Sequence, residues 1–376
     1  MNKTKILLAP NSFKECADSV KVIELFEKYL KNDDLEVLKF PISDGGDGYL
    51  NTLSFNIELK DLIYLISTPY NNSKFNCNIK YDRKNKIIYI ESAKVLGLEI
   101  IPLEKRHPLY LSSKGLGELL NMINNSILAG EIDVNKVVLG IGGTGTNDLG
   151  LGVCSIFGMN LYDIYNNDLK IIPKNFSKTN NIIWSKPKLE FEIECIVDVS
   201  NPLLGEKGAT NLFASQKGAT KEEIELLEIA FARIYNVLRN NELYDLAKSN
   251  YGAGGGLAAG LSIFFNSNII SAFDSMINDK SLIKKMEQAD IIITGEGKFD
   301  ETTLIGKGVS AILQIGKSLN KKVFLCCGQI DDNLILELNG NMQIIQLNKF
   351  STIDNYKLNF EKEVENACKI IVQAIS

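Results

Sequence analysis

The sequence is poor in the groups on which many enzymes depend. It contains a single histidine, His107, and seven cysteines, none of which forms a C-x-x-C pair. A zinc site built on several histidines is therefore excluded, and a Ser–His relay would have to use this one residue. General-base chemistry falls mainly to Asp, Glu or Lys. The odd cysteine count and the apolar setting of Cys326 and Cys327 predict reduced thiols and a cytoplasmic protein.

Long apolar runs and blocks of one charge are also missing. No apolar run reaches the roughly 18–20 residues needed to span a membrane, and the net charge of −5 arises from interspersed acidic and basic residues. We therefore expect neither a membrane nor a nucleic acid as a partner. With 376 residues, of which 45% are hydrophobic, the chain is long enough for two domains.

Strands and helices alternate at both ends of the chain. The apolar run 5–9, a helix opened by Ser19 and a second strand over 35–40 form a β-α-β start, which favours a parallel, doubly wound sheet. The alternation returns from about residue 285. There the pattern predicts strands over 289–294, 322–326 and 343–347 and helices over 304–319 and 360–374.

The middle of the chain has a different pattern. Three consecutive strands are predicted, over 57–67, 74–81 and 86–91, and a helix is predicted over 116–128. A strand over 192–197 precedes a long amphipathic helix over 221–239, which Thr220 and Glu223 open as a capping box. We therefore expect an α/β protein of two lobes. Residues 1–60 and 285–376 form a Rossmann-like doubly wound domain, and residues 61–284 form an inserted α/β domain.

Glycine or proline combines with polar side chains in several stretches, most of which follow a predicted strand. In open α/β sheets, ligands bind beyond the carboxyl ends of the strands. Carboxylates beside glycine loops suit Mg²⁺ and phosphate, and the glycine-rich loop that opens a predicted helix suits an anion. The stretches are APNSFK (9–14), SDGGDG (43–48), GIGGTGTNDLG (140–150), DVSNP (198–202), GAGGGLAAG (252–260) and TGEGKFD (294–300).

The stretch at 140–150 admits a second interpretation. Gly140, Gly142 and Gly145 fit the G-x-G-x-x-G dinucleotide fingerprint after a strand, and Asp163 lies near the required acidic spacing. An NAD-dependent oxidoreductase is therefore one alternative, although it leaves the other loops unexplained. A Walker A loop and the protein-kinase motifs are absent. A non-catalytic sugar-acid-binding protein is the other alternative.

Taken together, these stretches resemble the bacterial glycerate kinases that form 2-phosphoglycerate. That family opens with A-P-D-S-F-K, followed in order by A-D-G-G-E-G, R-x-P with G-x-G-E-L, G-I-G-G-S-A-T-N-D-G-G, D-V-x-N-P-L-x-G-x-x-G-A, Q-K-G-A and T-G-E-G-x-x-D. This chain has APNSFK, SDGGDG, Arg106-His107-Pro108 with GLGEL, GIGGTGTNDLG, DVSNPLLGEKGA, QKGA and TGEGKFD in the same order. The resemblance covers nearly the whole chain.

The resemblance implies a kinase that phosphorylates D-glycerate with ATP and Mg²⁺, with 2-phosphoglycerate favoured over 3-phosphoglycerate as the product. It implies an active site in the cleft between the two lobes, and it implies that GIGGTGTNDLG is a phosphate or substrate loop. We expect a monomer or a homodimer. The chain departs from the family pattern at Asn11, Gly145, Leu149, Ala214-Ser215 and Thr302. Asn11 removes a carboxylate, which leaves a neighbouring hydroxy acid or a binding role open.

The candidate site residues follow from these motifs. For catalysis we expect Asp198 as the base, because the lone histidine is a poor candidate. We expect Lys14 to balance phosphate charge and Asp44 to act as the base or as a Mg²⁺ ligand. Asp148 competes with Asp44 for the base or the Mg²⁺ role. Arg106 suits the substrate carboxylate, because an Arg fork binds carboxylates bidentately.

The candidates are grouped by task. The catalytic group is Asp198, Lys14 and Asp44, the substrate-binding group is Ser12, Arg106, Ser112 and Asn201, the nucleotide- or phosphate-binding group is Gly45, Gly46, Gly142, Gly143, Thr144, Gly295, Glu296 and Gly297, and the metal ligands are Asp148 and Asp300.

Overall fold

The computed structural model describes residues 3–13, 16–71, 73–240, 250–304, 307–331, 334, 341–347 and 353–375. The chain forms two compact units. Unit 1 comprises residues 1–44, 51–58 and 271–376, and unit 2 comprises residues 45–50 and 59–270. Both units are of the α/β class, as the sequence predicts. The domain ranges expected from the sequence stay a prediction.

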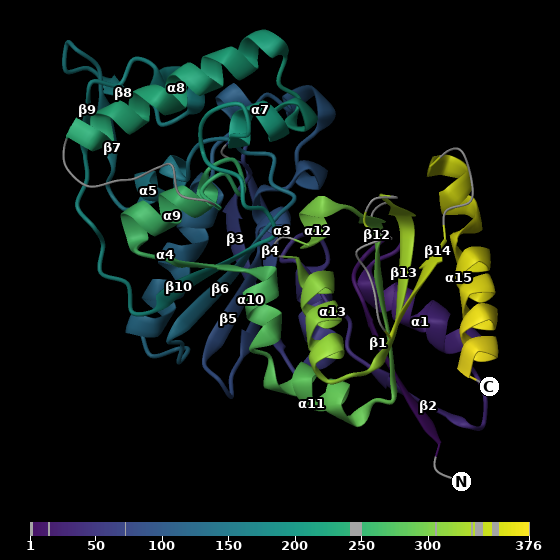
Figure 1. The fold of residues 1–376 in the computed structure, drawn as a ribbon. Helices are drawn as coiled ribbons and strands as arrows, with labels where there is room; N and C mark the ends of the chain where they lie inside the picture. Colours follow the sequence, from purple (N-terminus) through teal and green to yellow (C-terminus); the bar gives the residue numbers. More distant parts are fainter. Residues whose placement is uncertain are drawn as a thin grey trace. The chain divides into compact units, whose positions relative to one another are not determined.

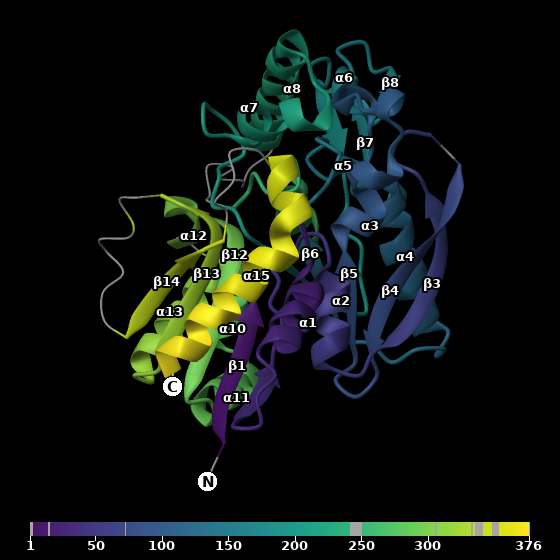
Figure 2. The same cartoon turned by 90° about the vertical axis from the view of Figure 1, so that its right-hand side faces the viewer.

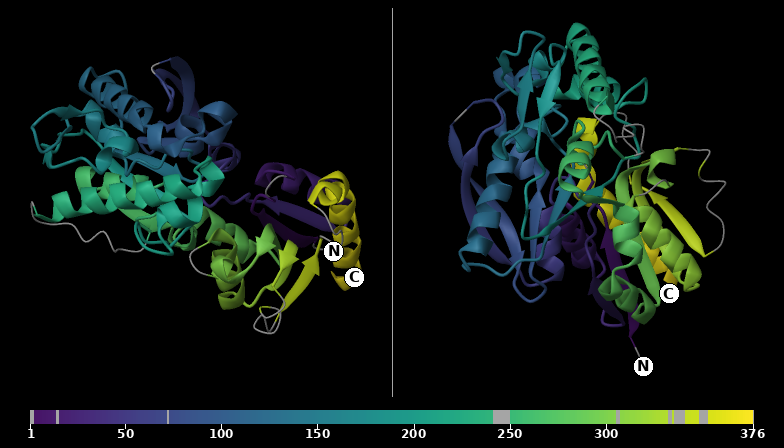
Figure 3. Two further views of the ribbon diagram at one scale, coloured as in Figure 1. Left: turned by 90° about the horizontal axis from the view of Figure 1, so that it is seen from above. Right: turned by 90° about the vertical axis from the view of Figure 1, so that its left-hand side faces the viewer.

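Unit 1 is built on a five-stranded sheet in the order β14-β13-β12-β1-β2, in which all neighbouring strands are parallel. The first strand lies beside β12, so both ends of the chain contribute to one sheet (Figure 3). The elements are β1 (Thr4–Pro10), α1 (Ser19–Tyr29), β2 (Leu35–Lys39), α10 (Ala272–Ile277), α11 (Lys280–Gln288), β12 (Ile291–Phe299), α12 (Glu301–Leu304), α13 (Gly308–Ser318), β13 (Lys322–Ile330), β14 (Met342–Gln346) and α15 (Ile353–Ile375). A short helix, α2 (Tyr49–Asn56), crosses from unit 2 into unit 1.

The strands of unit 1 bury both faces, and their side chains alternate between two cores. Ile6 and Leu8 point to the core formed with α1 and α15, whereas Leu7 and Ala9 point to the core formed with α10, α11 and α13. The two helix layers lie on opposite faces of the sheet (Figure 1), and α15 runs beside α1 (Figure 2). This is the doubly wound arrangement that the alternating pattern predicts.

Unit 2 is built on a six-stranded mixed sheet in the order β11-β10-β6-β5-β4-β3. Strands β10, β6 and β5 are parallel, and β5, β4 and β3 pair antiparallel, which confirms the run of consecutive strands expected from the sequence. The strands are β3 (Lys60–Ser67), β4 (Lys74–Asp82), β5 (Ile87–Glu91), β6 (Lys136–Ile141), β10 (Glu192–Val197) and β11 (Asn268–Ser271).

Helices and a small antiparallel sheet complete unit 2. The helices are α3 (Ser92–Leu96), α4 (Lys114–Leu128), α5 (Leu151–Ile156), α6 (Pro173–Phe176), α7 (Ala209–Phe213), α8 (Lys221–Asn240) and α9 (Leu257–Phe265). Single 3₁₀ turns are η1 (Leu98–Ile100), η2 (Leu103–Lys105), η3 (Pro108–Tyr110) and η4 (Ser215–Lys217), and the small sheet has β8 (Asp168–Leu169), β7 (Asn160–Tyr162) and β9 (Asn181–Ile183). Thr220 and Glu223 form the capping box predicted for α8.

Two expectations from the sequence are corrected. The stretch at 294–300 was expected to be a loop after a strand, but β12 continues to Phe299, because it pairs with β13 as far as Ile330. The helix expected over 304–319 is instead α12 followed by α13, which begins at Gly308. Gly295 therefore lies inside a paired strand.

The described part of the chain contains neither a membrane-spanning helix nor a disulfide. Among the described residues, no helix is both long enough and apolar enough to cross a membrane. All seven cysteines lie in the described part of the chain, and no disulfide joins any of them.

Gly295 is required by packing, which gives a prediction about stability. A Cβ atom at Gly295 would overlap the carbonyl oxygen of Cys326 on the neighbouring strand, and a strand in the middle of a sheet cannot move away. We expect Gly295→Ala to lower the free energy of unfolding by about 3 kcal/mol or more. The measurement is the midpoint of urea unfolding.

Gly316→Ala is the matched control in the same unit. Gly316 lies in α13, and its Cβ would meet only the side chains of Val323 and Ile292, which can adjust. Alanine also improves helix propensity, so we expect a change within about 1 kcal/mol. Equal destabilisation by the two substitutions would contradict the packing explanation.

Candidate active site

In unit 2, three parallel strands end at one edge of the sheet. Ile141 of β6 is paired with Val197 of β10, and Gly140 is paired with Glu91 of β5. The glycine loop that follows β6 and Asp198, which follows β10, therefore leave the sheet side by side. Ser92, the first residue after β5, uses its hydroxyl to accept from the Gly142 N–H at 3.1 Å and to donate to the Gly142 carbonyl at 2.9 Å.

The structure brings together two of the predicted phosphate loops. A Cβ atom at Gly142 would lie 2.6 Å from the Cα of Gly46, and one at Gly140 would meet the Gly45 carbonyl. The absence of side chains thus lets the turn 45–48 pack directly on the loop after β6. Gly143 is exposed and has a φ of +64°, with Asp47 beside it.

Glu91 is a residue of this region that the sequence analysis missed. Its carboxylate is 1% exposed and accepts the N–H groups of Gly48 at 3.2 Å and Leu50 at 3.0 Å. Burial is the main cause that raises the pKa of Glu91, and the two backbone donors oppose it. The only signal in the sequence was a glutamate at the end of an apolar strand.

The Asp148 carboxylate is buried and accepts hydrogen bonds from the surrounding protein. Its buried carboxylate accepts from the Ser113 N–H at 2.7 Å, the Ser113 hydroxyl at 2.9 Å, and the N–H groups of Gly150 and Gly152 at 3.2 Å each. Burial raises its pKa, and these hydrogen bonds act in the opposite direction. An oxygen pair already bound to N–H and O–H donors is poorly placed for a metal ion, which speaks against the ligand role expected for Asp148.

The inner side of the same loop is polar and buried. Thr144 is 4% exposed, and Thr146 and Asn147 are fully buried. Lys217, which is 3% exposed, donates from Nζ to the Thr146 carbonyl at 2.7 Å and to the Thr144 hydroxyl at 3.3 Å. Burial lowers the pKa of Lys217 to about 7, and the charge of Asp148 acts in the opposite direction. Lys217 belongs to the QKGA motif, from which no task for this residue was predicted.

The substrate candidates of unit 2 are held mainly by the backbone. The Arg106 guanidinium donates to the carbonyls of Ile101 at 3.1 Å and Leu98 at 2.9 Å, which leaves three of its five N–H groups for other partners. The Asn201 amide donates to the Lys207 carbonyl at 3.2 Å.

Ser112 borders a cavity of about 460 Å³ together with Lys114, Tyr110 and residues of the small sheet. Its hydroxyl accepts the Lys114 N–H at 3.3 Å. Asp198 is half-buried directly after β10 and is engaged in a polar interaction.

Unit 1 brings Asn11, Asp44 and the start of α13 together. The Asn11 amide donates to Asp44 Oδ2 at 2.5 Å, and Gly308, the first residue of α13, donates its N–H to Asp44 Oδ1 at 2.8 Å. The Ser12 N–H donates to the Asn11 side chain at 2.8 Å. Lys14, a predicted catalytic residue, lies outside the described residues.

Glu296 lies in the same region and is the most perturbed carboxylate there. Its side chain comes from β12, is 6% exposed, and has an oxygen, Oε1, without a hydrogen-bond partner. Burial raises its pKa to about 7, with Asp44 and Asp300 adding to the shift and Lys307 and Thr303 opposing it. A cation near this oxygen would relieve both the burial and the repulsion. Asp300 forms an ion pair with Lys298 at 3.0 Å.

These residues fit a metal ion carried by a phosphate ligand better than one held by protein alone. Among the described residues, no group of three or more His, Cys, Asp or Glu side chains is placed to hold a metal ion. Mg²⁺ commonly takes only one or two carboxylates and completes its shell with water and phosphate oxygens. The unpartnered Glu296 oxygen, with Asp300 nearby, matches that need.

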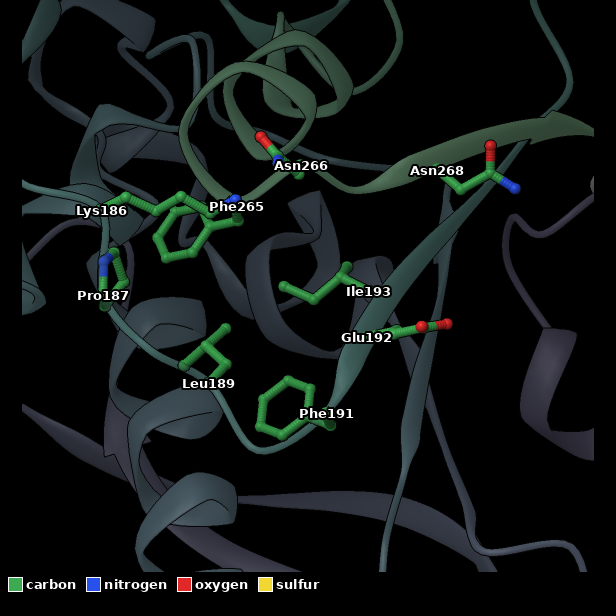
Figure 4. A pocket seen from close by; sticks show the side chains of 9 residues that line it. All are labelled: Lys186, Pro187, Leu189, Phe191, Glu192, Ile193, Phe265, Asn266 and Asn268. Atoms are coloured by element: carbon green, nitrogen blue, oxygen red, sulfur yellow. The ribbon is translucent and has the colours of Figure 1, made fainter.

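A second cavity lies at the other end of β10 and includes none of the predicted residues. It has a volume of about 350 Å³ and is bordered by the first residues of β10 and the end of α9. Figure 4 shows Leu189, Phe191 and Ile193 around its centre, with the polar ends of Glu192 and Asn268 directed away from them. It lies at the amino end of the strand, away from Asp198.

The geometry does not support a dinucleotide fold at 140–150. After β6, the chain passes through a loop to α5, which has only six residues, and then enters the small antiparallel sheet. The fingerprint requires a helix that returns to a parallel neighbouring strand. Over residues 136–183, all of which are described, no such unit is present.

Comparison with known proteins gives one consistent result. The model of the glycerate kinase family matches residues 6–376. The chain is 32% identical over 336 residues to a glycerate kinase of Haemophilus influenzae, covering 86% of this chain and 85% of the relative. It is 28% identical over 376 residues to the glycerate 2-kinase of Escherichia coli, covering 97% and 95%.

A solved structure agrees with these matches. A crystal structure described as glycerate kinase 2 from Salmonella typhimurium LT2 is 27% identical, has a TM-score of 0.77, and covers 100% of this chain and 98% of its own. The matched ranges include both units and the positions of all the motifs discussed above. The chain belongs to the glycerate kinase family of enzymes.

Proposed function

We propose that the protein transfers the γ-phosphoryl group of ATP, with Mg²⁺, to the C2 hydroxyl of D-glycerate, and that it acts in the cytoplasm. The observation that carries the proposal is the family match over residues 6–376. The choice of 2-phosphoglycerate over 3-phosphoglycerate follows the name of the Escherichia coli relative. The NAD-dependent oxidoreductase alternative is not supported, because the β-α-β unit that it requires is absent over residues 136–183, all of which are described.

In this proposal, residues of unit 1 meet the nucleotide and its metal. Glu296 and Asp300 would hold Mg²⁺, whose charge screens the phosphate oxygens and stabilises the charge that develops during transfer. Asp44, fixed by Asn11 and Gly308, keeps the acidic region in place. The tight packing at Gly295 supports a structural task for that residue, and Gly297 lies further along β12.

Residues of unit 2 meet the substrate. Asp198 would accept a hydrogen bond from the substrate hydroxyl and take its proton. It directly follows β10, at the edge of the sheet where the glycine loop follows β6. The Gly142 N–H is already bonded to Ser92, so Gly143 is the better phosphate contact of the two. The remaining N–H groups of Arg106 suit the glycerate carboxylate.

The test of the function is a coupled ADP-release assay on the purified protein with Mg-ATP and D-glycerate. The product is identified by phosphorus NMR. Turnover to 2-phosphoglycerate is the expected result. Folded protein that binds D-glycerate without releasing ADP would favour the non-catalytic sugar-acid-binding alternative.

Asp198→Asn tests the base. The amide keeps the size of the side chain but cannot accept the proton, so we expect kcat to fall about a hundredfold or more. Steady-state kinetics with D-glycerate measure the effect. Asp163→Asn is the control, because Asp163 caps an exposed turn of the same unit and is expected to leave kcat unchanged. A wild-type kcat in folded Asp198→Asn protein would remove Asp198 from this role.

Glu296→Gln and Asp300→Asn test the metal site. Each substitution removes one carboxylate, so we expect the Mg²⁺ concentration that gives half-maximal rate to rise about tenfold. Glu301→Gln is the matched control, because it removes the same charge from an exposed residue next to Asp300. If all three variants need the wild-type Mg²⁺ concentration, Mg²⁺ is not held by these carboxylates.

A further inference from the structure

The loop after β6 is attached to its surroundings by a closed chain of contacts. On one side, the backbone of Gly97 pairs with Thr144 in an isolated antiparallel bridge, and the Gly145 N–H donates to the Leu96 carbonyl at 2.7 Å. The residues that follow Gly97, η1 and Ile101, supply the two carbonyls that the Arg106 guanidinium binds. The loop, η1 and Arg106 are therefore joined through the backbone.

The chain of contacts returns to the loop through η4. Gly218 has a φ of +96°, and a Cβ atom there would overlap the carbonyl oxygen of Arg106. This contact fixes the backbone next to Lys217 against the segment that Arg106 holds. From that position, Lys217 reaches back to Thr144 and Thr146. Three separate sequence motifs, around Arg106, the glycine loop and Lys217, thus form one ring.

Burying the polar groups inside this ring costs free energy. The hydroxyl of Thr146 and the carbonyl oxygen of the Asn147 side chain lack hydrogen-bond partners, and the Lys217 ammonium is bonded to a carbonyl and a hydroxyl. A buried ammonium without a bonded carboxylate is disfavoured, as the lowered pKa of Lys217 indicates. A protein that needed only stability at this place would gain from an apolar side chain.

We propose that Lys217 is a positioning residue for phosphoryl transfer. Its ammonium holds residues 144–148 from the inside, so that the exposed part of the loop at Gly143 keeps the backbone geometry that the reaction requires. Lys217 itself does not touch the reacting atoms, because its Nζ lies beneath the loop and is bonded to it. The inference rests on the proposed function for its kinetic effect, although the local order of the loop can be measured without any substrate.

The experiment uses Lys217→Met, which keeps the length of the side chain and removes its charge and hydrogen bonds. We expect kcat with D-glycerate to fall at least thirtyfold, the KM values for ATP and D-glycerate to stay within threefold, and Tm to be unchanged or higher. Hydrogen exchange of the amides in a peptide covering residues 140–148, measured without substrate, should become at least tenfold faster. Lys221→Met, an exposed lysine in the first turn of α8, is the control and should change none of these values.

The outcomes separate the two proposals. Absence of turnover in the wild type overturns the proposed function, whereas the exchange experiment still tests Lys217. Wild-type exchange over 140–148 in Lys217→Met, or a kcat within twofold of the wild type, overturns the positioning role. A fall in Tm with activity lost in proportion to the unfolded fraction also overturns it, because a residue needed only for folding would behave in that way.

Discussion

A buried lysine side chain forms hydrogen bonds to the glycine loop after β6 from its inner side. Lys217 satisfies the Thr146 carbonyl and the Thr144 hydroxyl where water cannot reach them. Burial lowers the pKa of Lys217 to about 7, so placing the charged form of this side chain here costs free energy. Such an arrangement is understandable where a loop must be rigid before its ligand arrives.

The parallel register of unit 2 determines which side chains can share this edge. Because β5, β6 and β10 end at the same level, the residues after each strand become neighbours, although they are about 50 residues apart in the sequence. Ser92 then bonds the loop on one side, and Asp198 leaves the sheet on the other. The glycines at 45, 46, 140 and 142 allow the backbone of the turn after β2 to join them. The loop is therefore specified by close backbone packing as much as by side chains.

Much of the fold could be predicted from the sequence, because apolar periodicity reports directly on strands and helices. The β-α-β start, the consecutive strands of unit 2 and strand β10 were predicted closely. The extension of β12 through Gly295 was not, because glycines after an apolar run indicate a turn unless the pairing strand is known.

The site was harder to predict, since tasks depend on partners that are distant in the sequence. Asp148 has the residue type of a metal ligand, yet Ser113 and two glycine N–H groups occupy its oxygens. Glu91 and Lys217 were assigned no task, because a single charged residue usually lies at the surface. Only the fold shows that both are buried and that each holds a loop.

Asn11 is the departure from the family pattern that bears most directly on activity, and its contacts argue that it is tolerated. The amide donates to Asp44, whose other oxygen is bonded to the start of α13. An aspartate at position 11 would place its carboxylate within hydrogen-bond distance of the Asp44 carboxylate. Two carboxylates so close require a proton or a cation between them. Asparagine replaces that requirement with a hydrogen bond. Glu296 and Asp300 still supply carboxyl groups in the same region. The substitution thus removes one repulsive charge without removing the acidic site, and the main reason to suspect a non-catalytic protein loses its force.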